Sequence, residues 1–202
     1  MQRKHFYILI SFLISFLILA AFIVYLEEIP LDNYLFILIN QRLAFEGLDP
    51  FFLFGARVLV YIPMVPAAWL FLKGDKETRM IIIFMFMVVF FSRIIYETFK
   101  SMTGRLRPYD YLEDVRLIVE KRPELSFPSG HATVASVLTT FAFYFRRDKS
   151  RYLMILYLLT VAYSRIYVGV HYPLDVVGGI LLGVSTSLGF VALYETFSRK
   201  FE

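Results

Sequence analysis

The chain has 202 residues, of which 58% are hydrophobic, 18% aromatic and 19% charged, and its mean hydropathy is +0.64. Soluble domains are usually about 45–50% apolar with about 25% charged residues, so this composition excludes an ordinary soluble domain and a disordered chain. The sequence has no cysteine, which excludes disulfides, thiol nucleophiles and zinc–thiolate sites.

Six apolar stretches are candidates for membrane-spanning helices, because a bilayer core of about 30 Å requires about 20 apolar residues. They are residues 6–26, 50–72, 80–99, 129–145, 152–168 and 175–197. The first stretch continues well past its small residues, so we expect an uncleaved helix rather than a secretory signal. Since the six stretches account for most of the chain, the sequence predicts an all-α polytopic membrane protein with a single domain, residues 1–202.

Lysine and arginine accumulate in loops that stay in the cytoplasm, so their distribution indicates the orientation of the spans. Four segments carry most of them, namely residues 3–4, 73–79, 146–151 and 199–200. These segments fall on one side of a six-span protein, whereas the loop of residues 27–49 has five acids and only Arg42 as a base. The sequence therefore predicts a plasma (inner) membrane protein with both termini in the cytoplasm, and the net charge of +4 does not indicate a nucleic-acid partner.

Two segments of the predicted outer loops have helical patterns of their own. Residues 31–45 are apolar but too short to span comfortably, so we expect a re-entrant or interfacial helix on the outer face, with Asp32 and Asn33 as its cap. Residues 111–122 place apolar side chains at helical spacing, which favours an amphipathic helix lying at the outer interface.

Three polar clusters interrupt the apolar pattern, and the predicted topology puts all three on the outer face. Residues 100–108 follow the third span, residues 127–131 precede and begin the fourth, and residues 164–175 join the fifth and sixth. Two of the three histidines of the chain lie in these clusters. The fourth span is short, about 26 Å at 1.5 Å per residue, so His131 is expected at the depth of lipid headgroups.

The clusters contain cations and helix-start residues that suit a bound phosphate. Lys100, Arg107 and Arg165 can hold a dianion, and arginine offers a planar fork of donors. Ser129 and Gly130 open a predicted helix, whose free N–H groups and positive dipole end favour phosphate. Each pattern alone is commonly structural, as an interfacial cation or a helix cap, so it is their combination on one face that indicates a site.

The histidines supply reactive groups for the same site. His171 and Asp175 lie four residues apart, on one face of a helical turn. A carboxylate there can hold one imidazole nitrogen and leave the other free to attack, although such a pair can also be a structural contact at a helix start. His131 can then donate a proton to the leaving oxygen. Together these groups predict phosphoryl transfer that requires neither a metal nor another cofactor.

Written K-x6-R-P, P-S-G-H and S-R-x5-H-x3-D, the three clusters resemble the three-part signature of the type 2 phosphatidic acid phosphatase superfamily. Every signature position is present: Lys100, Arg107, Pro108, Pro128, Ser129, Gly130, His131, Ser164, Arg165, His171 and Asp175. The resemblance implies that His171 becomes a phosphohistidine, that His131 protonates the leaving group and that Asp175 orients His171. It also implies a phosphate-binding set of Lys100, Arg107, Ser129, Gly130 and Arg165.

The six-span layout resembles the lipid phosphatase branch of that superfamily, which implies a lipid phosphate substrate within the bilayer. Undecaprenyl diphosphate and phosphatidylglycerophosphate are the leading substrates that the resemblance implies, with lipid A as a third. The alternatives are transfer of the phosphoryl group to a lipid or sugar acceptor, a transporter whose outer cationic pocket only binds phosphate, and a haloperoxidase, which would need vanadate. Neither the sequence nor the resemblance specifies an oligomeric state.

Two arginines lie within predicted spans. Arg93 comes four residues before Glu97, and we expect an ion pair between them on the protein-facing side of the helix. Arg57 lies about two turns into the second span from the outer side, so we expect its side chain to extend towards the outer interface. A contact between Arg57 and the substrate headgroup is the alternative.

Overall fold

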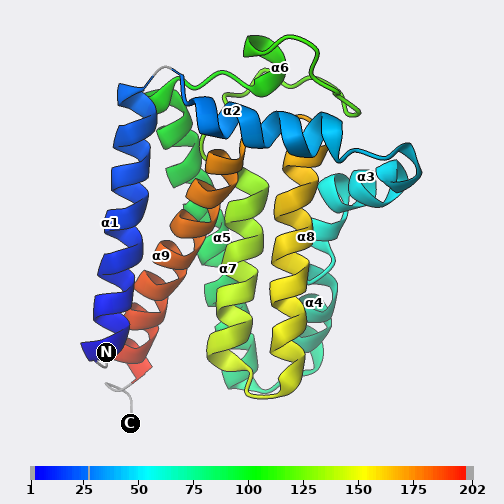
Figure 1. Cartoon of the computed structure of the whole chain (residues 1–202). Coiled ribbons are helices and arrows are strands. Elements are labelled where there is room, and N and C mark those ends of the chain that lie inside the picture. Colours follow the sequence, from blue (N-terminus) through cyan, green and yellow to red (C-terminus); the bar gives the residue numbers. More distant parts are fainter. Residues whose placement is uncertain (1–2, 27, 199–202) are drawn as a thin grey trace.

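A computed structural model describes residues 3–26 and 28–198, and this part of the chain contains helices but no strand (Figure 1). Its α-helices are α1 (Arg3–Tyr25), α2 (Pro30–Ile37), α3 (Asp49–Arg57), α4 (Met64–Lys73), α5 (Lys76–Thr103), α6 (Pro108–Tyr111), α7 (Gly130–Phe145), α8 (Leu153–Tyr167) and α9 (Pro173–Ser198). Four short elements complete the path, the π-helix η1 (Leu38–Arg42) and the 3₁₀ turns η2 (Glu46–Leu48), η3 (Leu59–Tyr61) and η4 (Lys149–Tyr152). The predicted all-α class is confirmed. Arg199 and Lys200, used to predict the topology, lie outside the described residues.

The long helices form an upright bundle with α9 in contact with most of the others. Helix α9 packs against α7, α1 and α5, and α8 packs against α7. In Figure 1, α1 begins and α9 ends at the same end of the bundle, while α2 and α6 lie at the opposite end. The connection between α7 and α8 also lies at the end where α1 begins.

Helices α7 and α9 approach each other closely because α9 carries glycines where the two backbones meet. A Cβ atom on Gly179 would lie 2.5 Å from the carbonyl oxygen of Ser129, and one on Gly183 would lie 2.5 Å from that of Thr133. Small residues of this kind allow membrane helices to pack backbone to backbone. The contact brings the start of α7 next to the start of α9, where the Ser129 N–H donates to the Asp175 carbonyl at 2.9 Å.

Three helices of the described residues, α1, α5 and α9, are long and apolar enough to cross a bilayer. A fourth candidate is the bent pair formed by residues 46–57 and 59–73. Helices α7 and α8 have 16 and 15 residues, or about 24 and 22 Å at 1.5 Å per residue, so they are shorter than a bilayer core. The described residues thus contain three to four candidate spans, as expected for a multi-pass membrane protein. The predicted count of six spans is not confirmed.

The second predicted span is broken rather than continuous. Helix α3 ends at Arg57, the turn η3 follows, and α4 begins at Met64; the segments of residues 46–57 and 59–73 are bent by 42° relative to each other. Pro63 precedes α4 directly, and a proline inside a continuous helix would lack an N–H donor and would collide with the carbonyl four residues earlier. Pro63 therefore explains why no continuous α-helix runs from η3 into α4, while the bend itself lies at Val58, between the two halves.

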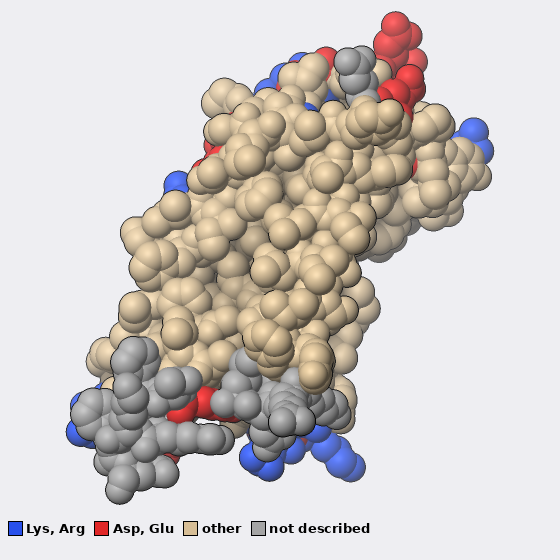
Figure 2. All heavy atoms as spheres, turned by 90° about the vertical axis from the view of Figure 1, so that its left-hand side faces the viewer, with Lys and Arg blue, Asp and Glu red and all other residues tan. Residues whose placement is uncertain are grey.

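A broad band of uncharged side chains covers one side of the bundle between two charged ends. Figure 2 shows this band on the side of the molecule at the left of Figure 1, with lysine, arginine, aspartate and glutamate confined mainly to its two ends. Many large apolar side chains of the long helices are exposed, for example Ile18, Phe90 and Leu156. An apolar belt of this kind is stable when lipid surrounds it.

Helix α2 and the π-helix that continues it lie across the end of the bundle, as expected for an interfacial element (Figure 1). The helix begins at Pro30, with Ile29 at its N-cap, and no side chain caps it. Asp32 is therefore not the cap that the sequence suggested. It is buried within the first turn of α2 and faces the start of α9.

The predicted amphipathic helix over residues 111–122 is wrong. Helix α6 ends at Tyr111, Asp114 has a positive φ of 57°, and the following residues run without regular structure. Arg116 is fixed through its backbone, because its N–H donates to Asn40 Oδ1 and its carbonyl accepts from Asn40 Nδ2, both at 2.9 Å. The apolar side chains of this segment pack against the end of α8 instead of forming a helical stripe.

Candidate active site

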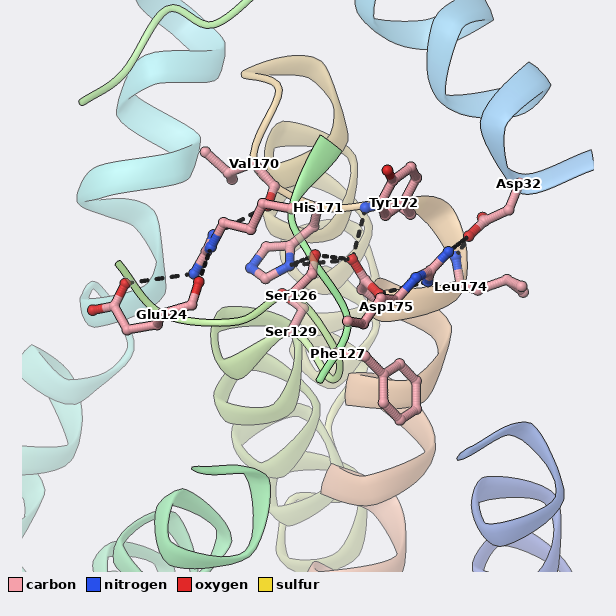
Figure 3. Close-up of polar contacts among 12 residues, drawn as sticks. Asp32, Glu124, Ser126, Phe127, Ser129, Val170, His171, Tyr172, Leu174 and Asp175 are labelled. Carbon is pink, nitrogen blue, oxygen red and sulfur yellow. Dashed lines mark hydrogen bonds and ion pairs between the residues drawn. The ribbon is translucent and has the colours of Figure 1, made fainter. Parts of the chain in front are cut away.

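The three polar clusters meet at the end of the bundle where α2 lies. They come from the end of α5 and the segment after it, the start of α7, and the connection between α8 and α9. Figure 3 shows the labelled side chains in a row, from Glu124 past His171 and Asp175 to Asp32. The structure therefore brings together residues separated by more than a hundred positions in the sequence.

His171 and Asp175 form a buried pair in the centre of this row. The Nδ1 atom of His171 lies 3.5 Å from Asp175 Oδ2, and the two side chains are 2% and 0% exposed. Ser126 Oγ donates to the same carboxylate oxygen and lies 3.4 Å from His171 Nδ1. Burial lowers the pKa of His171 to about 3, a shift that the hydrogen bond with Asp175 opposes and the nearby Arg107 and Arg165 reinforce. The imidazole is thus neutral at neutral pH.

Arg105 joins two buried carboxylates on different helices. Its guanidinium lies 2.7 Å from Asp175 Oδ1 and 2.5 Å from Asp32 Oδ2, and it stacks over the ring of Tyr172 at 4.2 Å. The other oxygen of Asp32 accepts from the Leu174 N–H at 2.9 Å. Burial raises the pKa of Asp32, and the charge and hydrogen bonds of Arg105 oppose that shift. One arginine therefore balances both carboxylates and ties α2 to the start of α9.

The three predicted phosphate-binding cations are buried at this site. Arg107 donates to the carbonyls of Glu124 and Val170, at 2.6 and 3.1 Å, which fixes its guanidinium beside the loop that carries His171. Arg165 donates from one terminal nitrogen to a backbone carbonyl, whereas its Nε is buried without a partner among the described residues. Lys100 lies 3.8 Å from Glu97 Oε1 and 5.4 Å from the centre of the Tyr96 ring.

The start of α7 presents donors that the protein itself does not use. Ser129 occupies the N-cap position, yet its Oγ caps no backbone N–H and is buried without a hydrogen bond in the described part of the chain. The N–H groups of the first helical turn have no intrahelical acceptors. Gly130 allows close approach of the Tyr96 ring, since a Cβ atom there would lie 2.9 Å from Tyr96 Cζ. His131 follows and lines a groove beside α5.

Two glycines with positive φ shape the segments that carry these groups. Gly104 has φ of 62° and ends α5 in the left-handed conformation, which turns the chain between Lys100 and Arg105. Gly169 has φ of 88° and turns the chain after α8, two residues before His171. Glycine adopts these conformations without the steric cost that a side chain would add.

The two arginines in predicted spans have different surroundings. Arg93 does not form the expected ion pair, because Glu97 lies beside Lys100 instead and the described residues provide Arg93 with no acidic partner. Its side chain is exposed and lines the same groove as His131. Arg57 is exposed at the end of α3 and lies outside that groove.

Comparison with known proteins identifies the family of this chain. Residues 78–199 match the model of the PAP2 superfamily. The chain belongs to the PAP2 superfamily. An undecaprenyl-diphosphatase of Sulfolobus acidocaldarius is 34% identical over 203 residues, which cover 96% of this chain and 94% of that protein. This chain is accordingly a membrane lipid phosphatase of the PAP2 superfamily, as the signature implied.

Two solved structures have a similar fold. The crystal structure of Aquifex aeolicus LpxE superposes with a TM-score of 0.72 and 27% identity, covering 83% of this chain and 98% of that one. A PAP2-type phosphatidylglycerolphosphate phosphatase from Bacillus subtilis has a TM-score of 0.57 and 22% identity, covering 93% and 96% of the two chains. The second likeness concerns the fold alone.

Three polar residues of the candidate site were not predicted there from the sequence: Asp32, Arg105 and Ser126. Arg105 and Ser126 lie close to signature positions, so proximity was a usable signal for them. Asp32 is 73 positions from Arg105, and its helix-start context favoured a cap instead. Only the folded arrangement reveals that it faces the site.

Proposed function

We propose that this phosphatase removes the terminal phosphate of a lipid diphosphate of the undecaprenyl type through a phosphohistidine intermediate. The observation that carries the proposal is a neutral, buried His171 held by Asp175, next to buried donors that have no acceptor. Ser129 Oγ and Arg165 Nε are these donors. Buried polar groups are rarely left unpaired, and a phosphate oxygen would satisfy both.

In the first step, His171 Nε2 attacks the terminal phosphorus while Nδ1–H donates to Asp175. The P–N bond forms as the bond between phosphorus and the bridging oxygen breaks, and His131 protonates that oxygen as the lipid monophosphate leaves. In the second step, water attacks the phosphohistidine and His131 accepts its proton, which releases phosphate and restores His171. The negative charge that develops faces Lys100, Arg107, Arg165, the Ser129 hydroxyl and the N–H group of Gly130.

The substrate class is inferred from the relatives and from the position of the site. The Sulfolobus acidocaldarius relative, which matches this chain over nearly its whole length, is named an undecaprenyl-diphosphatase. The reacting groups lie at one end of the apolar band, where the phosphates of bilayer lipids would be. We further propose six membrane crossings, with α7 and α8 as short spans, both termini in the cytoplasm and the site on the outer face of the plasma membrane.

Phosphate release from purified protein in detergent tests this function. The panel contains undecaprenyl diphosphate, phosphatidylglycerophosphate and lipid A, each with EDTA, and His171→Gln serves as the variant that removes the nucleophile. We expect release from undecaprenyl diphosphate to be fastest, to persist in EDTA and to fall below detection in the variant. Release that survives His171→Gln would disprove the nucleophile, and a preference for lipid A would reassign the substrate. If the terminal phosphate of the substrate is radiolabelled, a labelled product other than free phosphate would indicate transfer to an acceptor.

A further inference from the structure

A groove of about 350 Å³ leads from the side of the bundle to His131. It is bordered by η3, α4, α5 and α7, and the residues that matter here are Tyr61, Arg93, Tyr96, Gly130 and His131. The rest of its lining is apolar. His131 is thus reached from the part of the surface that faces lipid, and the groove has a polar strip along α5.

Arg93 is an unusual residue to find in this groove. It lies in the middle of the apolar helix α5, its side chain is exposed, and no acid of the described residues pairs with it. A charged side chain within a membrane helix is costly, and such residues are commonly retained because they bind something. The charge of Arg93 is therefore available to a ligand that enters the groove.

The spacing along α5 places Arg93 directly on the lipid side of the phosphate site. Arg93, Tyr96 and Lys100 follow each other at intervals of three and four residues, which puts them on one face of the helix. Arg93 is about 10.5 Å deeper than Lys100 at 1.5 Å per residue, and its long stem allows the guanidinium to extend back towards the headgroup region. Tyr96 lies between them, with its ring against Gly130 and beside Lys100.

The groove continues away from His131 as an apolar surface. Phe86 and Phe90 line it and also line an adjoining groove of about 570 Å³, which extends along α4 and α5 past Ala68 and Leu72. A ligand with its phosphate next to His131 would thus place a hydrocarbon tail along these side chains. Arg93 is one turn from Phe90, at the junction between the polar and apolar parts.

We propose that Arg93 binds the inner phosphate of a lipid diphosphate, the phosphate that stays on the lipid, and so selects diphosphates over monophosphates. The inference rests on the proposed function. The terminal phosphate occupies the site formed by Lys100, Arg107 and Arg165, and the inner phosphate then lies on the side from which Arg93 approaches. The planar guanidinium suits two phosphate oxygens at once. A lipid monophosphate has no second phosphate for Arg93 to hold.

The test compares two substrates with the same tail, farnesyl diphosphate and farnesyl monophosphate. In Arg93→Met we expect kcat/KM for the diphosphate to fall about 10- to 100-fold, since a hydrogen bond to a charged group is lost, and the value for the monophosphate to stay within about twofold. Inorganic diphosphate should inhibit the variant less well than the wild type, whereas inhibition by inorganic phosphate should not change. This second readout does not depend on turnover of either lipid.

Two further variants serve as controls. Arg93→Lys keeps the charge and should recover part of the preference for the diphosphate. Arg79→Met removes an arginine from the cytoplasmic end of the same helix and should leave kcat/KM unchanged for both substrates. An equal loss on both substrates, or no loss on either, overturns the role of Arg93 and leaves the phosphatase function standing. A wild-type protein that releases phosphate from neither substrate overturns the proposed function, and this inference with it.

Discussion

Asp175 is hydrogen-bonded on both carboxylate oxygens, and this fixes the orientation of the proposed nucleophile. Ser126 Oγ and the Tyr172 N–H donate to Oδ2, and Arg105 donates to Oδ1. The carboxylate therefore cannot rotate freely, and His171 Nδ1 faces an acceptor of defined position. At the scale of single residues the site depends as much on the groups around Asp175 as on the histidines.

Arg105→Met should destabilise the protein strongly. Its side chain is 13% exposed, and its guanidinium faces two carboxylates that are both fully buried, so its removal leaves uncompensated buried charges. We expect a loss of about 3–5 kcal/mol in the free energy of unfolding, measured by denaturant titration in micelles. Adding Asp32→Asn to the variant should recover part of that loss. Lys121→Met, which removes an exposed ion pair with Asp110, should leave stability nearly unchanged. An Arg105→Met protein as stable as the wild type would contradict this interpretation.

The buried His171 should make stability fall in acid. Its pKa is about 3 in the folded protein and about 6.5 in an unfolded chain, so between these values the unfolded state binds one more proton than the native state. The protonation of this group does not lower the free energy of unfolding above about pH 6.5, and it lowers that free energy progressively as the pH falls towards 3. His171→Gln cannot titrate, and its unfolding free energy should depend less on pH between 7 and 4. Parallel pH profiles for the two proteins would disprove the assignment.

At the scale of helices, the contact between α7 and α9 determines whether the site can assemble. The two helices carry Ser129 to His131 and Asp175 respectively, and their close approach requires the absence of a side chain at the contact. A bulkier residue would push the start of α7 away from α9, and the hydrogen bond between the Ser129 N–H and the Asp175 carbonyl would lengthen.

Gly183→Ala is expected to destabilise the protein by about 1–3 kcal/mol, because its Cβ would lie 2.5 Å from the Thr133 carbonyl and 2.7 Å from Ser136 Cβ. Gly189 provides the matched control on the same helix, because a Cβ atom there meets nothing within 4 Å. Gly189→Ala should stabilise by up to about 1 kcal/mol through helix propensity. Thermal unfolding of both variants in detergent measures the difference, and equal midpoints would contradict the packing argument.

Much of the helical framework was predictable because long apolar runs have few other ways to satisfy their backbone in a bilayer. The helix starting at Gly130 and the clustering of Lys100, His131 and His171 both follow from sequence pattern and order. Residues 111–122 were not predictable in this way. Their apolar spacing fits a helix, but the amide of Asn40, from a distant element, binds the backbone of Arg116 and holds the segment irregular.

Charge partners were the other unpredictable feature. A helical i,i+4 spacing made Arg93 and Glu97 a reasonable pair, yet Glu97 is next to Lys100 at i,i+3 instead. Arg105 has partners 70 and 73 positions away. Local spacing indicates which charges can meet on one helix, whereas contacts between helices depend on the packing that the whole chain adopts.

At the scale of the molecule, the site and the connection between α7 and α8 lie at opposite ends of the bundle (Figure 1). If the site is outside the cell, the α7–α8 connection is inside. Because the sequence has no cysteine, single cysteines can report these positions without background labelling.

Glu113→Cys and Lys149→Cys place thiols at exposed positions near the site and on the α7–α8 connection. In intact cells, a membrane-impermeant maleimide should label the first and spare the second. Detergent should make both accessible, and phosphate release should confirm that each variant is folded. Labelling of Lys149→Cys alone in intact cells would place the site in the cytoplasm and reverse the proposed orientation.

The bond between Asp32 and the Leu174 N–H joins an early helix to the last one, and it has a consequence for biosynthesis. A chain is made from its amino terminus, so the cations of residues 100–107 and the start of α7 exist before His171 and Asp175 emerge. Until α9 enters the membrane, the nascent protein has neither the Asp175 carboxylate that holds His171 nor the contact between α7 and α9 that assembles the site. Chemical competence is acquired in the final stage of synthesis, and a chain truncated before α9 would keep His171 but should not hydrolyse the lipid phosphate, because the site cannot assemble without α9.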